Sequence, residues 1–163
     1  SRSLGLLGAC LVVGLAGWLW VFGLGVAAFG LGSVATSAPL LGVVAAAVGS
    51  YTLVAVSIGF LMGQIGLGQH AANAVANIGG MALSFLGGAW VPIEWLPDSL
   101  ARAARLTPGY WADRAISGAY EATSMSAAVI GPLLVDCGIC ALFAVAVFSV
   151  AVAVARARAR SAL

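Results

Sequence analysis

Four long apolar segments dominate this chain of 163 residues and constrain its fold more than any other feature. They cover residues 4–31, 39–67, 71–91 and 126–155. An α-helix crosses the hydrocarbon core of a bilayer with about 20 mostly apolar residues. Only helices and closed barrels satisfy backbone hydrogen bonds in lipid, and these segments are too long and too uniformly apolar for barrel strands. The sequence therefore predicts an all-α membrane protein with four transmembrane helices in a single transmembrane domain.

The composition excludes an ordinary water-soluble domain. Hydrophobic residues make up 63% of the chain and charged residues 7%, whereas about a quarter of the residues of a soluble domain are charged. The formal net charge of +2 is too small to indicate a nucleic-acid partner. The chain begins with Ser1 instead of a methionine, so we expect it to be part of a longer protein.

The arginines set the expected orientation, because the chain contains no lysine. One group flanks the termini: Arg2, Arg156, Arg158 and Arg160. The other group, between the third and fourth segments, contains Arg102, Arg105 and Arg114. Cytoplasmic loops close to span ends carry an excess of arginine and lysine. The pattern predicts that both termini are cytoplasmic and that residues 92–124 lie outside; the reverse orientation stays open because the two groups differ by one arginine.

Small residues recur at every fourth position of the third segment, at Ala72, Ala76, Gly80, Ser84 and Gly88. This spacing places them on one face of a helix and lets another helix approach closely. The stripe indicates either packing within the chain or a seam with a second copy of it.

One segment, residues 87–120, interrupts the apolar pattern. The third apolar helix is expected to end at Gly87 and Gly88, and Pro92 and Pro97 then prevent a continuous helix. Trp90 and Trp95 flank this exit, and tryptophan rings prefer the headgroup level of a bilayer.

Two short helices are predicted within this break. Asp98 is expected to be the N-cap of a helix across residues 99–106. Thr107 is expected to be the N-cap of a second helix, which has Pro108 as its first residue and carries Tyr110, Trp111, Asp113, Arg114 and Tyr120. Residues 92–124 are therefore interpreted as a helical hairpin that dips partway into the outer leaflet; a plain surface loop with interfacial aromatic residues is the alternative.

Asp136 is the one charged residue inside an apolar segment. An ionised carboxylate at the bilayer centre costs roughly 2.5–3.5 kcal/mol on insertion scales. It is expected to be protonated, exposed to water or paired. A structural pair with Arg102, Arg105 or Arg114 is favoured, and a polar point on a substrate route is the alternative.

Other gate or route candidates are Trp18, Trp20, Glu94 and Trp95. Glu94 lies between the two prolines of the break and is either an interfacial cap or an exit gate. Trp18 and Trp20 could line a hydrophobic cavity, although aromatic residues in a span are more often packing residues.

Catalytic and cofactor motifs are absent from the sequence. It has no Gly-x-x-x-x-Gly-Lys phosphate loop and no His-Glu-x-x-His zinc motif. Cys137 and Cys140 form a Cys-x-x-Cys, but the further ligands that a metal needs are missing nearby, and His70 is far away in sequence. They are interpreted as small apolar packing residues. The sequence thus predicts no catalytic site, no metal and no cofactor in this chain.

The order of these features resembles the carboxy-terminal half of the ABC type-2 exporter permeases. In that family a glycine-rich end of the fifth span leads into an aromatic-Pro-x-x-x-Leu-Pro sequence, a short helix, a Pro-x-Tyr turn and the last span. The matching residues here are Gly87, Gly88, Trp90, Pro92, Leu96, Pro97, Leu100, Pro108, Tyr110 and Asp113. The polar patch at residues 64–77 resembles the cytoplasmic start of the fifth span through Gln69, His70, Asn73 and Asn77.

The resemblance implies the transmembrane subunit of an ATP-driven exporter in a bacterial plasma membrane. Two permeases, identical or sibling chains, would pair above two separate ABC ATPase subunits, which would bind ATP and Mg. The cargo would be a hydrophobic or amphiphilic small molecule such as a drug, an antibiotic or a lipid. Such permeases usually have six spans, so the four here would correspond to the third through sixth. The alternative is a non-transporting scaffold or degenerate permease that assembles with partner proteins.

Overall fold

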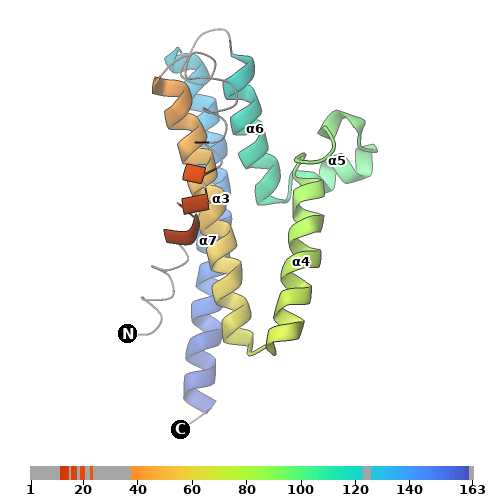
Figure 1. The fold of residues 1–163 in the computed structure, drawn as a ribbon, viewed down its shortest axis with the longest axis vertical. Coiled ribbons are helices and arrows are strands. Elements are labelled where there is room, and N and C mark those ends of the chain that lie inside the picture. Colours follow the sequence, from red (N-terminus) through yellow and green to blue (C-terminus); the bar gives the residue numbers. More distant parts are fainter. Residues whose placement is uncertain are drawn as a thin grey trace.

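The structure is a computed structural model that describes residues 12–14, 16–17, 19–20, 23, 38–122 and 126–161. Its elements are α3 (Ala38–Ile65), α4 (Gln69–Leu86), the 3-10 helix η1 (Ile93–Trp95), α5 (Asp98–Ala104), α6 (Pro108–Glu121) and α7 (Ala127–Ser161) (Figure 1). Every element of the described residues is helical, which confirms the predicted all-α class. The predicted first span, residues 4–31, lies largely outside the described residues.

Two helices of the described residues are long and apolar enough to cross a membrane, over Pro39–Ile65 and Ala127–Arg160. Both expose large apolar side chains, such as Leu142 (66% exposed) and Val145 (61%) on α7. Lipid can cover this surface without a hydration cost. α4 occupies most of the predicted third span, residues 71–91, but ends at Leu86 and carries four polar residues in its first half: Gln69, His70, Asn73 and Asn77.

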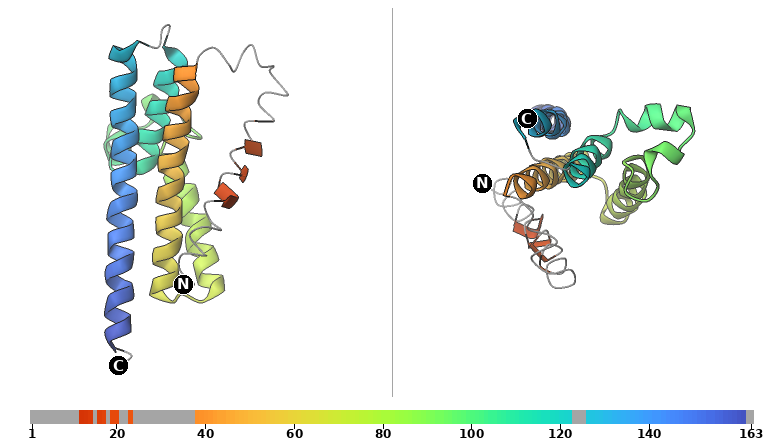
Figure 2. Two further views of the ribbon diagram at one scale, coloured as in Figure 1. Left: turned by 90° about the vertical axis from the view of Figure 1, so that its left-hand side faces the viewer. Right: turned by 90° about the horizontal axis from the view of Figure 1, so that it is seen from above.

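The core is a three-helix bundle in which α6 packs against the paired helices α3 and α7 (Figure 2). α3 and α7 run in the same direction and α6 runs against them. The buried side chains form three layers: Leu40 and Val43 with Ala119 and Leu133; Ala47 with Ala115 and Cys137; and Val54 with Ala112, Cys140 and Ala144. The buried side chains that α6 contributes to these layers are alanines, so its backbone comes close to both partners, and Trp111 and Ile116 pack at the edges.

Cys137 and Cys140 belong to this core, with 6% and 0% of their surfaces exposed. The Cys137 thiol lies 3.9 Å from the carbonyl oxygen of Val43 on α3. Both cysteines thus occupy packing positions between α3 and α7, as the sequence predicted.

α6 begins as its sequence predicts. The Thr107 hydroxyl accepts a hydrogen bond from the backbone N–H of Tyr110 at 3.5 Å and donates to the carbonyl of Ala104 at 2.7 Å. Pro108 occupies the first helical position, where its missing N–H leaves no partner unsatisfied. Thr107 therefore ends α5 and starts α6, which fixes the corner between the two helices.

The predicted N-cap of α5 is wrong by one residue. Asp98 is the first residue of α5, and Pro97 holds the N-cap position without a side-chain cap. The reason is the extended backbone of Pro97 (ψ 147°), whose carbonyl accepts the N–H groups of Leu100 and Ala101 at 2.8 and 3.0 Å. Asp98 still lies in the first turn, where a carboxylate is favourable to the helix dipole.

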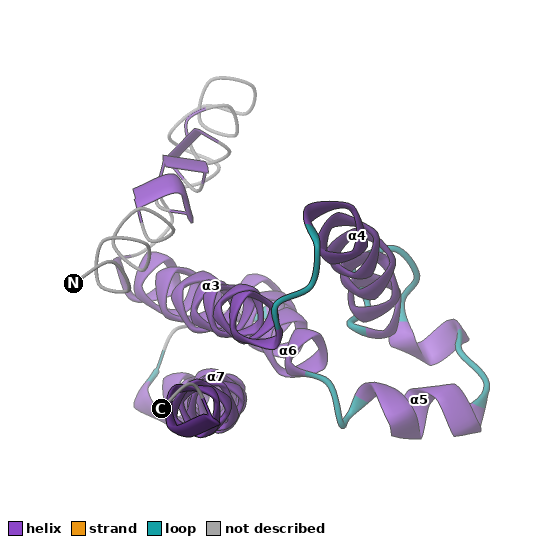
Figure 3. Cartoon of the chain, turned by 90° about the horizontal axis from the view of Figure 1, so that it is seen from below, coloured by secondary structure: helices purple, strands orange, loops and turns teal. Residues whose placement is uncertain are grey.

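α4 stands apart from the bundle and is attached at its two ends (Figure 3). No residue of α4 is buried. At the upper end of α4, a Cβ added at Gly87 would lie 3.0 Å from the Cα of Gly109 in α6. The end of α4 and the start of α6 therefore touch backbone to backbone. Gly88 follows with φ +92°, a left-handed conformation that glycine adopts without strain.

The lower end of α4 starts from a second glycine turn. Gly66 has φ +70° and follows the last residue of α3. Arg158 of α7 donates from Nη2 to the carbonyl oxygen of Ile65 at 2.7 Å. This bond satisfies a carbonyl at the end of α3, where a positive charge is also favourable to the helix dipole.

Candidate functional site

An apolar groove lies between α3 and α4. It has a volume of about 300 Å³, and its lining includes Pro108, the first residue of α6. Its walls are small or apolar: Val54, Ala55, Ile58, Gly59 and Met62 from α3, and Val75, Ala76, Gly79, Gly80 and Leu83 from α4. Tyr51 supplies the one hydroxyl group. α4 is joined to α3 by residues 66–68 at its lower end and contacts α6 through Gly87 at its upper end, and the groove lies between these two ends.

A second cavity of about 180 Å³ adjoins the groove and shares Tyr51 and Leu83 with it. The other lining residues are Ser84, Gly87, Ala89, Gly109, Ala112, Asp113 and Ile116. We call this the polar cavity after two of its lining residues, Ser84 and Asp113, although most of its lining is apolar. The two cavities together place an apolar wall below and a carboxyl group above.

Asp113 is half-buried, and burial together with the nearby Glu94 raises the pKa of its carboxyl above the ordinary value. Its Oδ2 would lie only 2.9 Å from a Cβ added at Gly88. The left-handed glycine turn is therefore also what makes room for the carboxyl group. Among the described residues, no hydrogen bond or ion pair is formed by the Asp113 carboxyl group.

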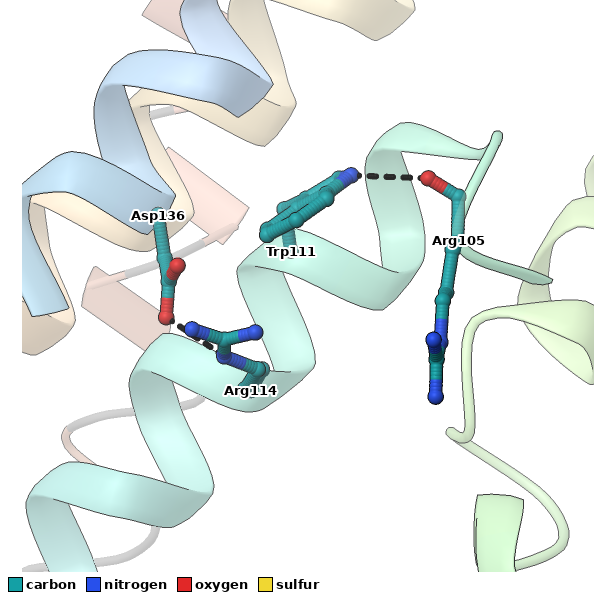
Figure 4. Close-up of polar contacts among 4 residues, drawn as sticks. All are labelled: Arg105, Trp111, Arg114 and Asp136. Atoms are coloured by element: carbon teal, nitrogen blue, oxygen red, sulfur yellow. Dashed lines mark hydrogen bonds and ion pairs between the residues drawn. The ribbon is translucent and has the colours of Figure 1, made fainter. Parts of the chain in front are cut away.

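Arg114 of α6 and Asp136 of α7 form an ion pair (Figure 4). Arg114 Nε donates to Asp136 Oδ2 at 2.9 Å; the Asp136 side chain is 2% exposed and the Arg114 side chain 51%. The Arg114 guanidinium also lies 5.2 Å from the ring centre of Trp111, and Trp111 Nε1 donates to the carbonyl of Arg105 at 2.9 Å. This network ties α6 to α7 and to the end of α5.

The structure selects one of the three predicted partners of Asp136. Arg114 makes the pair because α6 packs directly on α7. Arg102 instead donates from Nε to the carbonyl of Asp98 at 3.3 Å, within α5. The predicted pairing of Asp136 with an arginine of residues 92–124 is thus present, and a role of Asp136 on a substrate route stays a prediction.

The predicted gate residues lie elsewhere. Glu94 and Trp95 belong to η1, where Trp95 is 79% exposed, and Trp20 is 71% exposed. Trp20 and Trp95 line neither cavity. Trp18 lies outside the described residues. Glu94 is not a lining residue of either cavity, and its charge helps to raise the pKa of Asp113.

The small-residue stripe of α4 faces the two cavities. Ala76 and Gly80 line the groove, Ser84 lines the polar cavity and Gly88 contacts Asp113. Ala72 precedes them on the same helix. The stripe therefore borders a cavity within this chain, and the prediction of a seam with a second copy stays a prediction.

The residues that resemble the permease family shape the break. Pro92 and Pro97 precede η1 and α5, and Leu96 follows η1. Gly87 contacts Gly109, Gly88 makes the left-handed turn, and Pro108 lines the groove. The Tyr110 ring packs edge-on against Trp111, with 5.1 Å between the ring centres.

Sequence reasoning missed Tyr51 and Asp113 as site residues. The available signals were a hydroxyl group halfway along an apolar segment and a carboxylate next to an arginine in a short helix.

Comparison of the chain with protein-family models, with curated proteins and with solved structures finds no match.

Proposed function

We propose that this chain is the transmembrane subunit of an ATP-driven exporter that moves a hydrophobic or amphiphilic small molecule outward. The observation that carries the proposal is the apolar groove between α3 and α4, which contains a single hydroxyl group and has Pro108 of α6 in its lining. Ligand pockets typically enclose about 300–1,000 Å³ and are mostly apolar. The resemblance to ABC type-2 permeases adds the power source, a separate ATPase subunit.

In this proposal residues 4–31 and 71–91 complete a set of four spans, and α5 and α6 form the outer hairpin. The layers of the bundle support a hairpin that dips into the outer leaflet. Ala112, near the start of α6, packs at the level of Val54, halfway along α3, whereas Ala119 packs at Leu40, near its outer end. α6 thus runs beside the outer half of a helix long enough to span.

Charge placement supports opposite membrane boundaries for the arginine-rich end of α7 and for the Arg114–Asp136 pair; the cytoplasmic position of the termini rests on the excess of one arginine at their side. A hydrocarbon core of about 30 Å corresponds to about 20 residues of α-helix. Counting about 20 residues back from Arg156 along α7 reaches Asp136. The Arg114–Asp136 pair then lies near the outer boundary, where water reaches the half-exposed Arg114 side chain.

The test is recruitment and stimulation of an ATPase. The full-length protein is co-expressed with candidate ABC ATPase subunits, purified and reconstituted in lipid nanodiscs. We expect one ATPase to co-purify and its hydrolysis rate to rise when a lipophilic compound is added. An ATPase that binds but does not respond to any lipophilic compound would contradict the transport proposal.

A non-transporting scaffold is the second candidate. The observation that favours it is the outward face of α4, where Ile78 and Met81 are 71% and 67% exposed and no residue of the helix is buried. Such a face suits a partner helix as well as lipid. Stable capture of partner membrane proteins without any bound ATPase would favour the scaffold.

A further inference from the structure

We propose that the groove and the polar cavity together bind a cationic amphiphile, with its apolar part between α3 and α4 and its positively charged head at Asp113. As a statement about cargo it rests on the proposed exporter function; as a statement about binding it can be tested alone. The geometry behind it is the shared boundary of the two cavities at Tyr51 and Leu83.

The apolar part of the ligand is specified by the groove. Of the twelve described lining residues, Tyr51 is the one with a polar side-chain group. The other eleven are aliphatic residues, glycines, Met62 and Pro108. A polar or charged group in this space would lose its hydration without gaining a hydrogen bond, which costs free energy. An alkyl chain or a flat apolar ring system loses nothing there and buries apolar surface.

The sign of the head group follows from the charges around the polar cavity. Among the described residues that line the two cavities, Asp113 is the one that carries a charge, and the charge of the nearby Glu94 helps to raise its pKa. The neighbouring Arg114 is paired with Asp136 of α7. A cation between the carboxyl groups would relieve their repulsion, whereas an anion would add to it.

Tyr51 favours a quaternary ammonium head in particular. Its side chain lines both cavities, where the apolar and polar parts of an amphiphile would meet. Aromatic rings attract cations that cannot donate hydrogen bonds, and recognition of quaternary ammonium groups relies on this attraction. Asp113 and Tyr51 would then contribute a charge and a ring to the same head group.

The experiment uses three probes with the same ten-carbon chain: decyltrimethylammonium, decanol and decyl sulfate. Binding of each radiolabelled probe to the full-length protein in nanodiscs is measured above binding to empty nanodiscs. We expect decyltrimethylammonium to bind most tightly and decyl sulfate least. Equal binding of decyl sulfate and decyltrimethylammonium would overturn the proposal.

Variants separate the two parts of the site. Asp113→Asn should weaken decyltrimethylammonium binding by about tenfold or more, because a partly buried charge pair is worth at least that factor, and should leave decanol binding within twofold. Gly80→Leu should weaken both probes, since a Cβ at Gly80 meets no atom within 4 Å and the new side chain can enter the groove. Glu121→Gln, at the exposed far end of α6, is the matched control and should change neither.

An unchanged preference for the cation in Asp113→Asn, in a variant with the melting temperature of the parent protein, would overturn the proposal. The exporter proposal fails separately. Charge-selective binding without recruitment of an ATPase would support this site and contradict the exporter. A recruited ATPase that responds to decanol but not to decyltrimethylammonium would support the exporter and overturn the cationic cargo.

Discussion

Among the described residues, Arg114 is the cation paired with the buried carboxylate of Asp136, and replacing it by methionine removes that partner. Asp136 is 2% exposed and accepts a hydrogen bond from Arg114 Nε at 2.9 Å. Breaking a fully buried pair from one side costs about 3–5 kcal/mol. Because the Arg114 side chain is 51% exposed, water can reach the pair, and we expect a smaller loss of unfolding free energy, about 2–3 kcal/mol.

The opposite replacement should cost less. Asp136→Asn keeps a hydrogen-bond acceptor, and the Arg114 guanidinium that loses its partner can turn to solvent. We expect a loss of about 1 kcal/mol, the net value of one ordinary hydrogen bond. The double variant Arg114→Met, Asp136→Leu removes both charges and should lie within about 1 kcal/mol of the parent protein, because apolar replacement of such pairs is often neutral.

Unfolding of the full-length protein in detergent micelles, followed by tryptophan fluorescence, provides the assay. Trp111 is a suitable reporter because its ring lies 5.2 Å from the Arg114 guanidinium. Arg102→Met is the matched control, since Arg102 is exposed and bonds only within α5, and it should shift stability by less than about 0.5 kcal/mol. If Asp136→Asn costs more than Arg114→Met, or if the two losses simply add in the double variant, the reasoning about a buried uncompensated charge is refuted.

Three further predictions concern α4, α6 and α7. Gly87→Ala should destabilise the protein by about 1–3 kcal/mol, since the new methyl group overlaps Gly109. Gly79→Ala, inside α4 with no atom within 4 Å of the new methyl group, should not destabilise it in the same thermal unfolding assay. The folded protein binds the Asp113 proton more tightly than the unfolded chain, so stability should fall as the pH rises from 3.8 through the raised pKa; Asp113→Asn should flatten a plot of melting temperature against pH, and an unchanged slope would contradict the shift. Asp136→Asn should keep normal expression but alter export of a lipophilic substrate from reconstituted vesicles, and wild-type export would exclude a role of Asp136 on the route.

Features set by neighbouring residues could be predicted from the sequence. Thr107 and Pro108 start α6 as expected because an N-cap hydroxyl and a first-position proline act within one turn. The predicted N-cap of α5, Asp98, is wrong by one residue, because the carbonyl of Pro97 already accepts the first hydrogen bonds of the helix. The membrane-spanning potential of α3 and α7 follows from composition and length alone.

Features set by contacts between distant segments could only be narrowed. The sequence offered three arginines as possible partners of Asp136. Arg114 forms the pair because α6 packs on α7. The groove depends on the angle at which α4 leaves the bundle. That angle is set by the contact between Gly87 and Gly109, which are 22 positions apart in the sequence. Tyr51 and Asp113 therefore carried no local signal of a shared cavity.

Gly66 and Gly88, the two left-handed glycines that flank α4, are placed where hinge residues of this helix would lie. Gly66 and Gly88 adopt left-handed backbone angles without strain, and no residue of α4 between them is buried. A small tilt of α4 therefore changes the width of the groove while the bundle of α3, α6 and α7 stays intact. Arg158 donates a hydrogen bond to the carbonyl of Ile65, the residue before Gly66. A displacement of the end of α7 would therefore be transmitted to the glycine turn from which α4 starts.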